Sequence, residues 1–267
     1  MNQPTPAFTA VVLAADRADD DPVAKAAGVC CKSLTAVGGT PMVLRVIAAL
    51  DAAQDIESCL LSGPRRSAVE EEADLRTRIA SGQLRWLEPQ ATPSASAYYA
   101  MQSLPEHIPV LVTTADHALL TARIVDYFCS EARATGGDVV VGVARHQLVA
   151  AAFPGVRRTA MRLRDGGYCG CNLFAFLTPR GRAAALFWRR VETQRKRPWR
   201  VVSALGWIAV SRYLLGRLSL AEGLAGISRR MGLRVGAVLM PFPEAALDVD
   251  TVSDWMLAQA IVRDLAP

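Results

Sequence analysis

The chain has 267 residues, of which 51% are hydrophobic and 21% are charged, and its formal net charge is +5. This length and composition suffice to bury a sizeable core in one large α/β domain, so we predict a single domain over residues 1–267. No apolar run reaches the roughly 18 residues of a membrane-spanning helix, which excludes a protein that crosses the membrane.

Strand-like and helix-like segments alternate over the first half of the chain. The expected strands cover residues 8–15, 58–62, 84–87, 109–114 and 138–144, and the expected helices cover 41–50, 68–80, 94–104 and 121–134. The first strand is a continuous apolar run, which is typical of a buried parallel strand. Alternation at these lengths predicts a mostly parallel central sheet that helices cover on both faces.

The alternation changes past residue 155. Residues 159–164 and 170–177 flank a Gly166-Gly167 turn and predict a hairpin. Three helices are then expected at about 180–194, 201–215 and 219–231, followed by a strand at 234–240 and a closing helix from Val252.

The segment from residue 180 to residue 234 is strongly basic. It contains thirteen Lys/Arg against two Asp/Glu, a net +11, whereas the rest of the chain has 17 against 23, a net −6. Together with its tryptophans, this charge predicts a phosphorylated or membrane-surface partner, and the alternative is a solvated helical face. The segment carries no motif that reads nucleic acid, so we expect no nucleic-acid partner.

The six cysteines predict reduced thiols in a cytoplasmic protein, because no cleavable apolar leader is recognisable. Cys30-Cys31 and Cys169-x-Cys171 could combine into a thiolate metal site, but neither pair has the gap of a zinc ribbon. We therefore expect ordinary buried thiols.

Ligands of open α/β sheets bind outside the carboxyl ends of the strands, so the loops that follow the strands are the candidate site. The first such loop carries Lys32 ahead of a Gly38-Gly39 turn. A lysine there can meet a triphosphate as a point charge and neutralise the leaving pyrophosphate, and the alternative is a solvated lysine.

Two further strand ends carry carboxylates. Asp116 directly follows the expected strand 109–114, and Asp248 and Asp250 are spaced to lie on one side of an extended segment. Two carboxylates distant in sequence could share one Mg²⁺ or Mn²⁺ that bridges phosphate oxygens. The alternative is helix capping, by Asp116 on one helix and by Asp250 or Thr251 on the closing helix.

Taken in order, these segments resemble a known superfamily over most of the chain. The matching segments are VVLAADR, KSLTAVGGTPM, PSASA, TTADHALLT, GCNLFAF and DVDTVSDW. They resemble the NTP-transferases that include molybdenum-cofactor guanylyltransferases, diphosphocytidyl-methylerythritol synthases and sugar-phosphate nucleotidyltransferases. DHALLT, GGYxGCNLF and RKRPWR are similar to a bacterial subgroup of MobA-like proteins. The resemblance implies a Rossmann-like, GT-A-like nucleotidyltransferase fold, with the basic helices at about 180–232 as an insertion.

The resemblance also implies roles for individual residues. Lys32 would contact phosphate, Asp116 and Asp250 would bind the metal, and Asn172 would face the acceptor. The nucleotide would lie against Leu13, Ala14, Ala15, Asp16, Arg17, Lys32, Ser94 and Ala95. Beside this, arginine forks match phosphate oxygens, so Arg195, Lys196 and Arg197 are expected to hold the phosphate of the acceptor.

The chain departs from the family pattern in its first loop. Asp16 stands where the family has glycines whose amides approach the triphosphate, and Asp19, Asp20 and Asp21 add three negative charges. Cys31 stands where the family has proline before the lysine. Either a cation is recruited here or these carboxylates face solvent.

The expected activity is Mg²⁺-dependent transfer of a nucleotide from an NTP, CTP preferred over GTP, to a phosphorylated small molecule or lipid-head-group precursor, with release of pyrophosphate. The alternatives are a nucleotide-binding regulatory module that has lost turnover and a GT-A sugar transferase with a nucleotide-sugar donor. We expect a cytoplasmic protein, with peripheral contact to the inner membrane through residues 188–217 as a further hypothesis.

Overall fold

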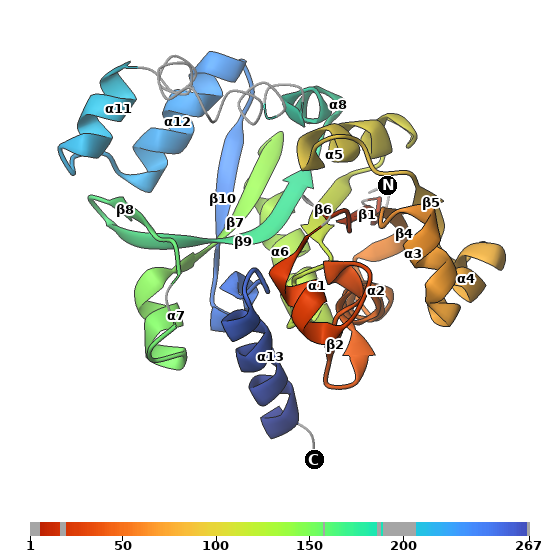
Figure 1. Cartoon of the computed structure of the whole chain (residues 1–267). Coiled ribbons are helices and arrows are strands. Elements are labelled where there is room, and N and C mark those ends of the chain that lie inside the picture. Colours follow the sequence, from red (N-terminus) through yellow and green to blue (C-terminus); the bar gives the residue numbers. More distant parts are fainter. Residues whose placement is uncertain (1–5, 17–19, 157, 186–187, 189–206, 266–267) are drawn as a thin grey trace.

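The computed structural model describes residues 6–16, 20–156, 158–185, 188 and 207–265 (Figure 1). Its main sheet has the strand order β10-β7-β9-β6-β1-β4-β5, with β8 paired to β9. The strands are β1 (Phe8–Leu13), β4 (Ile56–Ser62), β5 (Arg85–Leu87), β6 (Val110–Thr114), β7 (Val139–Arg145), β8 (Met161–Leu163), β9 (Gly166–Phe176) and β10 (Val235–Met240). A separate two-stranded ribbon, β2 (Ala36–Val37) and β3 (Thr40–Pro41), carries the predicted glycine turn.

Helices cover both faces of the sheet, as predicted. On one face α2 (Met42–Asp51) packs on β1 and β4, and α6 (Ala122–Ala134) packs on β7, β9 and β10. On the other face lie α5 (Pro93–Gln102), α8 (Pro179–Arg182) and α12 (Leu220–Met231) (Figure 1). The remaining helices are α1 (Pro22–Ala27), α3 (Arg66–Glu71), α4 (Ala73–Ala80), α7 (His146–Ala152), α11 (Trp207–Leu214) and α13 (Val252–Leu265), with two 3-10 turns, η1 (Lys32–Leu34) and η2 (Pro243–Ala246). None of the helices in the described ranges is long and apolar enough to span a bilayer.

The core explains why the first strand is apolar throughout. Phe8, Ala10 and Val12 belong to the apolar cluster under α2 and α6, whereas Val11 and Leu13 belong to the cluster under α5. Because successive side chains of a strand point to opposite faces, a strand covered on both faces has no polar side. The prediction of a mostly parallel, doubly covered α/β sheet is therefore confirmed.

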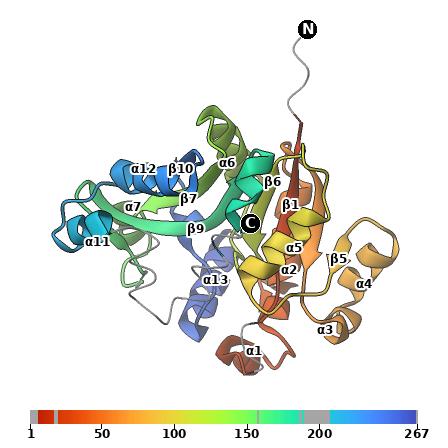
Figure 2. The ribbon, with the colours of Figure 1, turned by 90° about the horizontal axis from the view of Figure 1, so that it is seen from above.

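The predicted hairpin is present, but its second strand, β9, also continues into the main sheet, which the sequence did not predict. β8 pairs antiparallel with the start of β9, and the rest of β9 runs between β6 and β7 as an antiparallel member of the sheet. Figure 2 shows β9 curving across the sheet toward α11 and α12. The strand therefore links the sheet centre to the basic helical segment.

One helical prediction needs correction, and one helix was missed. The expected helix 68–80 is two helices, α3 and α4, because the Glu72 backbone is extended and its carboxylate caps the second helix at Asp74 N–H. The helix α7 was not predicted. Of the helix expected at 201–215, the described part is α11, and most of the helix expected at 180–194 lies outside the described residues.

A buried arginine fixes the loop that leads into β6. Arg182 of α8 is only 4% exposed. Its guanidinium donates to the backbone oxygens of Met101, Leu104, Pro105 and Ile108. Buried carbonyls without a donor are costly, so one side chain from α8 satisfies a whole turn and sets where β6 begins.

We expect Arg182→Met to lower the free energy of unfolding by about 3–5 kcal/mol, because it removes the donor of one buried and three partly buried backbone carbonyls. Urea denaturation followed by circular dichroism measures this loss. The matched control is Arg180→Met in the same helix, whose exposed side chain donates to the oxygen of Gly232. The free energy of unfolding of Arg180→Met should change by only about 0.5 kcal/mol. Equal losses in both variants would contradict the proposed role of Arg182.

Candidate active site

The loops after β1 and β4 pack directly against each other. Ala14 N–H donates to Ser62 O at 2.9 Å. Gly63 has a φ of +83°, and a Cβ on it would lie 2.9 Å from the backbone nitrogen of Ala15, so only glycine fits. β1 lies between β4 and β6, where the strand order reverses, which is where open α/β sheets bind ligands.

Lys32 joins the two predicted carboxylates. It begins η1 after β1, and its ammonium donates to Asp116 Oδ2 at 2.6 Å and to Asp250 Oδ1 at 3.2 Å. The lysine side chain is 17% exposed. Burial opposes the charged form, but the two carboxylates outweigh it and raise the pKa of Lys32 above its usual range. The ammonium therefore stays charged at the edge of the sheet.

Backbone bonds bring the two carboxylates together. Asp116 directly follows β6. Val249 N–H donates to Asp116 O at 3.0 Å, and this bond places the neighbouring Asp250 beside Asp116. Burial works against an ionised Asp116, yet the Lys32 ammonium holds the pKa of Asp116 below its usual range. Asp250 is more open, with 57% of its side chain exposed. Both predicted metal ligands thus lie within hydrogen-bond distance of one cation.

Threonines rather than these carboxylates cap the two helices, so of the capping alternatives only Thr251 at the closing helix is confirmed. The N-cap of α6 is Thr121, whose hydroxyl accepts from Ile124 N–H. At α13, the Thr251 hydroxyl accepts from Asp254 N–H, and Thr251 N–H donates to the Asp254 carboxylate. Asp116 and Asp250 are therefore left to face Lys32.

The acidic first loop is only partly turned toward the site. Both oxygens of Asp16 accept the Lys32 N–H, at 3.2 and 3.0 Å. Burial raises the pKa of Asp16. Asp21 caps α1 by accepting from Val23 and Ala24 N–H, and the exposed Asp20 pairs with Lys25 at 2.8 Å. Asp19 and Arg17 lie outside the described residues.

Asp248 does not share Lys32 with Asp250. Its carboxylate accepts from the Arg158 guanidinium and, at 3.0 Å, from the Asn172 side-chain amide. Arg158 also donates to Asp248 O at 2.8 Å and pairs with Asp254 at 3.2 Å. Asn172 has a φ of +47°, an uncommon conformation that asparagine tolerates better than most residues. Asn172, the residue predicted to face the acceptor, is thus bonded to Asp248, which lies two residues before Asp250 in the chain.

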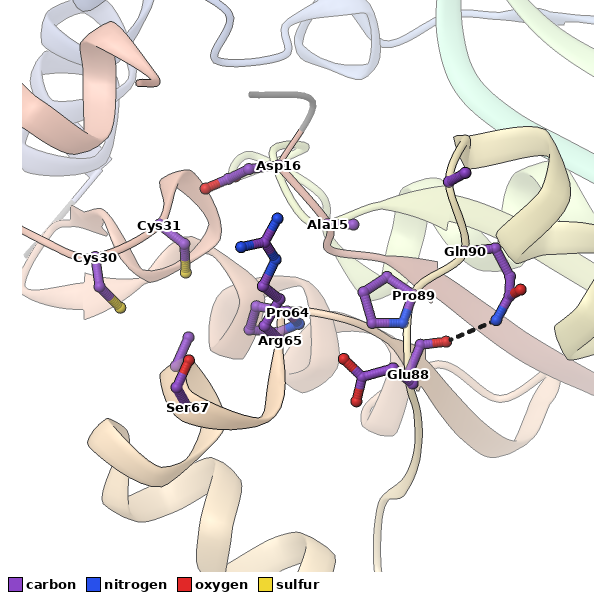
Figure 3. A pocket seen from close by; sticks show the side chains of 12 residues that line it. Ala15, Asp16, Cys30, Cys31, Pro64, Arg65, Ser67, Glu88, Pro89 and Gln90 are labelled. Atoms are coloured by element: carbon purple, nitrogen blue, oxygen red, sulfur yellow. Dashed lines mark hydrogen bonds between the residues drawn. The ribbon is translucent and has the colours of Figure 1, made fainter. Parts of the chain in front are cut away.

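Two cavities adjoin at this edge, and both are lined by Ala15 and Asp16. The lysine cavity, of about 280 Å³, is further lined by Leu13, Ala14, Asp21, Lys32, Ser33, Pro93, Thr114, Ala115, Asp116 and Asp250. The side cavity, of about 590 Å³, is further lined by Cys30, Cys31, Pro64, Arg65, Ser67, Ala68, Glu88, Pro89, Gln90 and Ala91 (Figure 3).

Some of the residues predicted to contact the nucleotide line the lysine cavity, and others do not. Leu13, Ala14, Ala15 and Asp16 line the lysine cavity. Ser94 is fully buried, with its hydroxyl 3.1 Å from that of Thr92. Pro93 lines the lysine cavity, whereas Ser94 and Ala95 do not. Arg195, Lys196 and Arg197 lie outside the described residues. Their roles stay predictions.

Three further residues belong to this region and were not singled out from the sequence. Arg65 follows β4, so the rule that directs attention to strand ends would have found it. Arg158 precedes β8 and carries no local signal. His117 follows Asp116 and is 1% exposed, and burial lowers its pKa to about 4, which leaves the imidazole neutral at neutral pH.

The cysteines lie apart from any cluster of metal-ligand side chains in the described ranges. All six are free thiols, and the described residues contain no group of three His, Cys, Asp or Glu able to hold a metal. Five of them are buried, as expected, whereas Cys30 is exposed.

The carboxylates fit a hard divalent cation that takes its other ligands from substrate and water. No hydrogen bond of normal geometry reaches Asp116 Oδ1 from the described residues, although this oxygen is buried. Mg²⁺ prefers oxygen ligands and is usually held by one or two carboxylates together with phosphate oxygens. Asp116 and Asp250 match that donor set, and the ammonium between them is already a cation bound by the same oxygens.

Comparisons with known proteins identify the family and the fold. The MobA-like NTP transferase domain family matches residues 10–193. A hypothetical transferase from Thermus thermophilus is 31% identical, with a TM-score of 0.77, and the match covers 93% of this chain and 99% of that chain. A comparison with curated protein sequences gives no match.

More distant structures share the fold. A 4-diphosphocytidyl-2C-methyl-D-erythritol synthase from Anaerococcus prevotii is 12% identical with a TM-score of 0.57, over 97% of both chains. A CMP:2-keto-3-deoxy-manno-octonic acid synthetase in complex with CTP is 11% identical with a TM-score of 0.56, over 97% of this chain and 100% of that one. The predicted Rossmann-like nucleotidyltransferase fold is confirmed, and the chain belongs to the MobA-like NTP transferase family of nucleotidyltransferases.

Proposed function

We propose that the protein transfers a nucleotide from an NTP to a phosphorylated acceptor and releases pyrophosphate. The observation that carries this proposal is the Lys32 ammonium held between Asp116 and Asp250 at the carboxyl edge of the sheet. Nucleotide transfer of this kind needs positioning and charge stabilisation rather than a covalent intermediate. A lysine and two carboxylates aimed at one point can supply both.

Asp116 and Asp250 would hold Mg²⁺ or Mn²⁺, which when bound neutralises phosphate oxygens and orients the triphosphate. The Lys32 ammonium, which these carboxylates hold at the same point, would contact a phosphate of the triphosphate. Its raised pKa keeps it charged, so it can stabilise the negative charge that develops on the leaving pyrophosphate. His117 beside Asp116 is buried, and because burial lowers its pKa to about 4 it adds no positive charge there at neutral pH.

The acceptor would enter from the side of β9. Asn172 is bonded to Asp248, which lies two residues before Asp250, and this proximity supports the proposed role of Asn172 toward the acceptor. Arg195, Lys196 and Arg197 are proposed to hold the acceptor's phosphate, because arginine forks match phosphate oxygens. The acceptor is a phosphorylated small molecule or a lipid-head-group precursor.

CTP is the proposed donor. Among structures that share the fold, one is a diphosphocytidyl-methylerythritol synthase and another was solved with CTP. Both of those proteins are named for cytidine nucleotides, and this favours CTP over GTP as the donor for this chain.

We expect Asp116→Asn to lower the rate of pyrophosphate release by on the order of 10²–10³, because the site loses one of the two charges proposed to hold the cation. A coupled pyrophosphate assay with Mg²⁺ and candidate phosphorylated acceptors measures this. The control is Asp74→Asn on the exposed surface of α4, which should leave the rate unchanged.

The same assay separates the proposal from its alternatives. A nucleotide-binding regulatory module would bind NTP without releasing pyrophosphate, and a sugar transferase would consume a nucleotide sugar and leave free NTP intact. An Asp116→Asn variant as active as the wild type would remove the proposed metal role.

We expect CTP with Mg²⁺ to raise the melting temperature more than GTP, ATP or UTP do, because a ligand that binds only the folded state stabilises it. At a concentration of about 100 times Kd the stabilisation is about 2.7 kcal/mol. Thermal-shift measurements with each NTP, with and without Mg²⁺, give the ranking. A larger shift with GTP would overturn the choice of donor, and equal shifts without Mg²⁺ would argue against a metal-bound triphosphate.

We also propose peripheral contact of the basic helical segment with anionic membranes. Trp207 and Leu214 are seven residues apart on α11, so they lie on one face, and they are 63% and 77% exposed. Glu222 is the one acidic residue between 207 and 234, and it pairs with Arg212 at 2.7 Å. An exposed apolar face in a basic segment suits the headgroup region of an anionic bilayer.

We expect the protein to bind vesicles with about 30% phosphatidylserine at low salt, and to bind neutral phosphatidylcholine vesicles much more weakly. The double variant Trp207→Ala/Leu214→Ala should lower this binding at least about tenfold, since both side chains would enter the bilayer. Vesicle sedimentation measures it. Met256→Ala, at an exposed apolar side chain of α13, is the control. No binding by the wild type at low salt would refute the contact.

A further inference from the structure

The lysine cavity is acidic for a site proposed to take a triphosphate. Four carboxylates line it: Asp16, Asp21, Asp116 and Asp250. Among the described residues that line the cavity, Lys32 has the one cationic side chain, and it is already bonded to carboxylates. Its N–H is bonded to Asp16, and its ammonium is bonded to Asp116 and Asp250. Because like charges repel strongly in a partly enclosed site, one divalent cation and one shared lysine leave the phosphate chain short of positive charge.

Arg65 supplies a cation at the junction of the two cavities. It lies two residues after Gly63, the glycine that fits against the Ala15 backbone, so its position follows from the packing of the loops after β1 and β4. It lines the side cavity, and Figure 3 shows its guanidinium extending toward Asp16 and Ala15, the two residues that line both cavities. Burial raises the pKa of Asp16, and the Arg65 charge is among the influences that oppose this rise, in keeping with their proximity.

The neighbouring arginine, Arg66, does not extend toward the cavities as Arg65 does. Arg66 donates to Glu70 at 3.1 Å, and its guanidinium lies 5.6 Å from the centre of the Trp86 ring. It lines neither cavity. Two adjacent residues of one type therefore have different surroundings, one at the surface of α3 and one at the cavity junction.

We propose that Arg65 is a second phosphate-binding cation of the nucleotide site, which contacts the triphosphate where the two cavities meet. This inference rests on the proposed function and adds a residue to it. The planar guanidinium can donate two parallel hydrogen bonds to phosphate oxygens, which a lysine cannot do. The rest of the side cavity, between Pro64 and Pro89, is then left for the nucleoside.

The test uses the full-length protein with inorganic tripolyphosphate and Mg²⁺, measured by isothermal titration calorimetry, and with cytidine as a second probe. Arg65→Met should raise the Kd for tripolyphosphate at least tenfold and change the Kd for cytidine less than twofold. Arg65→Lys should lie between wild type and Arg65→Met. Arg66→Met should stay within twofold of wild type for both probes, and melting curves check that each variant folds.

A second comparison separates phosphate contact from an indirect effect through Asp16. If Arg65 acted only by holding Asp16, Asp16→Asn would weaken tripolyphosphate binding as Arg65→Met does, and combining the two would add nothing. The proposal instead expects Arg65→Met to cost at least tenfold in the Asp16→Asn background as well.

Several outcomes would overturn the proposal: wild-type affinity of Arg65→Met for tripolyphosphate, an equal loss for cytidine, or no tripolyphosphate binding by the wild type. These results are distinct from failure of the proposed function, which is judged by pyrophosphate release. A protein that needs Arg65 to bind tripolyphosphate but releases no pyrophosphate would keep the phosphate site and lose the transferase proposal.

Discussion

The contact between one lysine ammonium and two carboxylates at the edge of the sheet is the interaction on which the site depends. Lys32, Asp116 and Asp250 are far apart in sequence, and each is costly to bury as an isolated charge. Together they neutralise one another in part, so that burial does not discharge the lysine. The same arrangement leaves net negative charge around the ammonium, which is the electrostatic condition under which a divalent cation is attracted.

Backbone geometry rather than side-chain packing brings these charges together. Val249 N–H to Asp116 O aligns the late segment with the end of β6, and Ala115 N–H to Leu13 O aligns β6 with the end of β1. Gly63 allows the loop after β4 to approach the same point. The site is thus built where four chain segments meet at the carboxyl edge, which is the usual ligand position in open α/β sheets.

The unusual first loop has a physical explanation in part. Asp21 is a helix cap and Asp20 pairs with a neighbouring lysine, so two of its acidic residues have local roles. Asp16 is different, because it accepts the Lys32 N–H and lies on the wall shared by the two cavities. The Asp16 carboxylate fixes the Lys32 backbone, but its negative charge also repels phosphate. Binding of a triphosphate here therefore needs nearby cationic side chains to offset that repulsion.

The sequence by itself determined the alternation of strands and helices, because a strand buried on both faces must be apolar throughout, as Phe8–Leu13 is. It also indicated Lys32, Asp116 and Asp250, since the loops after strands are where ligands bind. It did not determine that the second strand of the hairpin would enter the sheet between β6 and β7, because strand order depends on long-range pairing that local pattern does not contain. Tertiary structure alone decided that Asp248 bonds to Arg158 and Asn172 while Asp250 reaches Lys32, because those partners come from distant segments. The position of Arg65 was likewise decided there, since it follows from a close approach of two loops at Gly63.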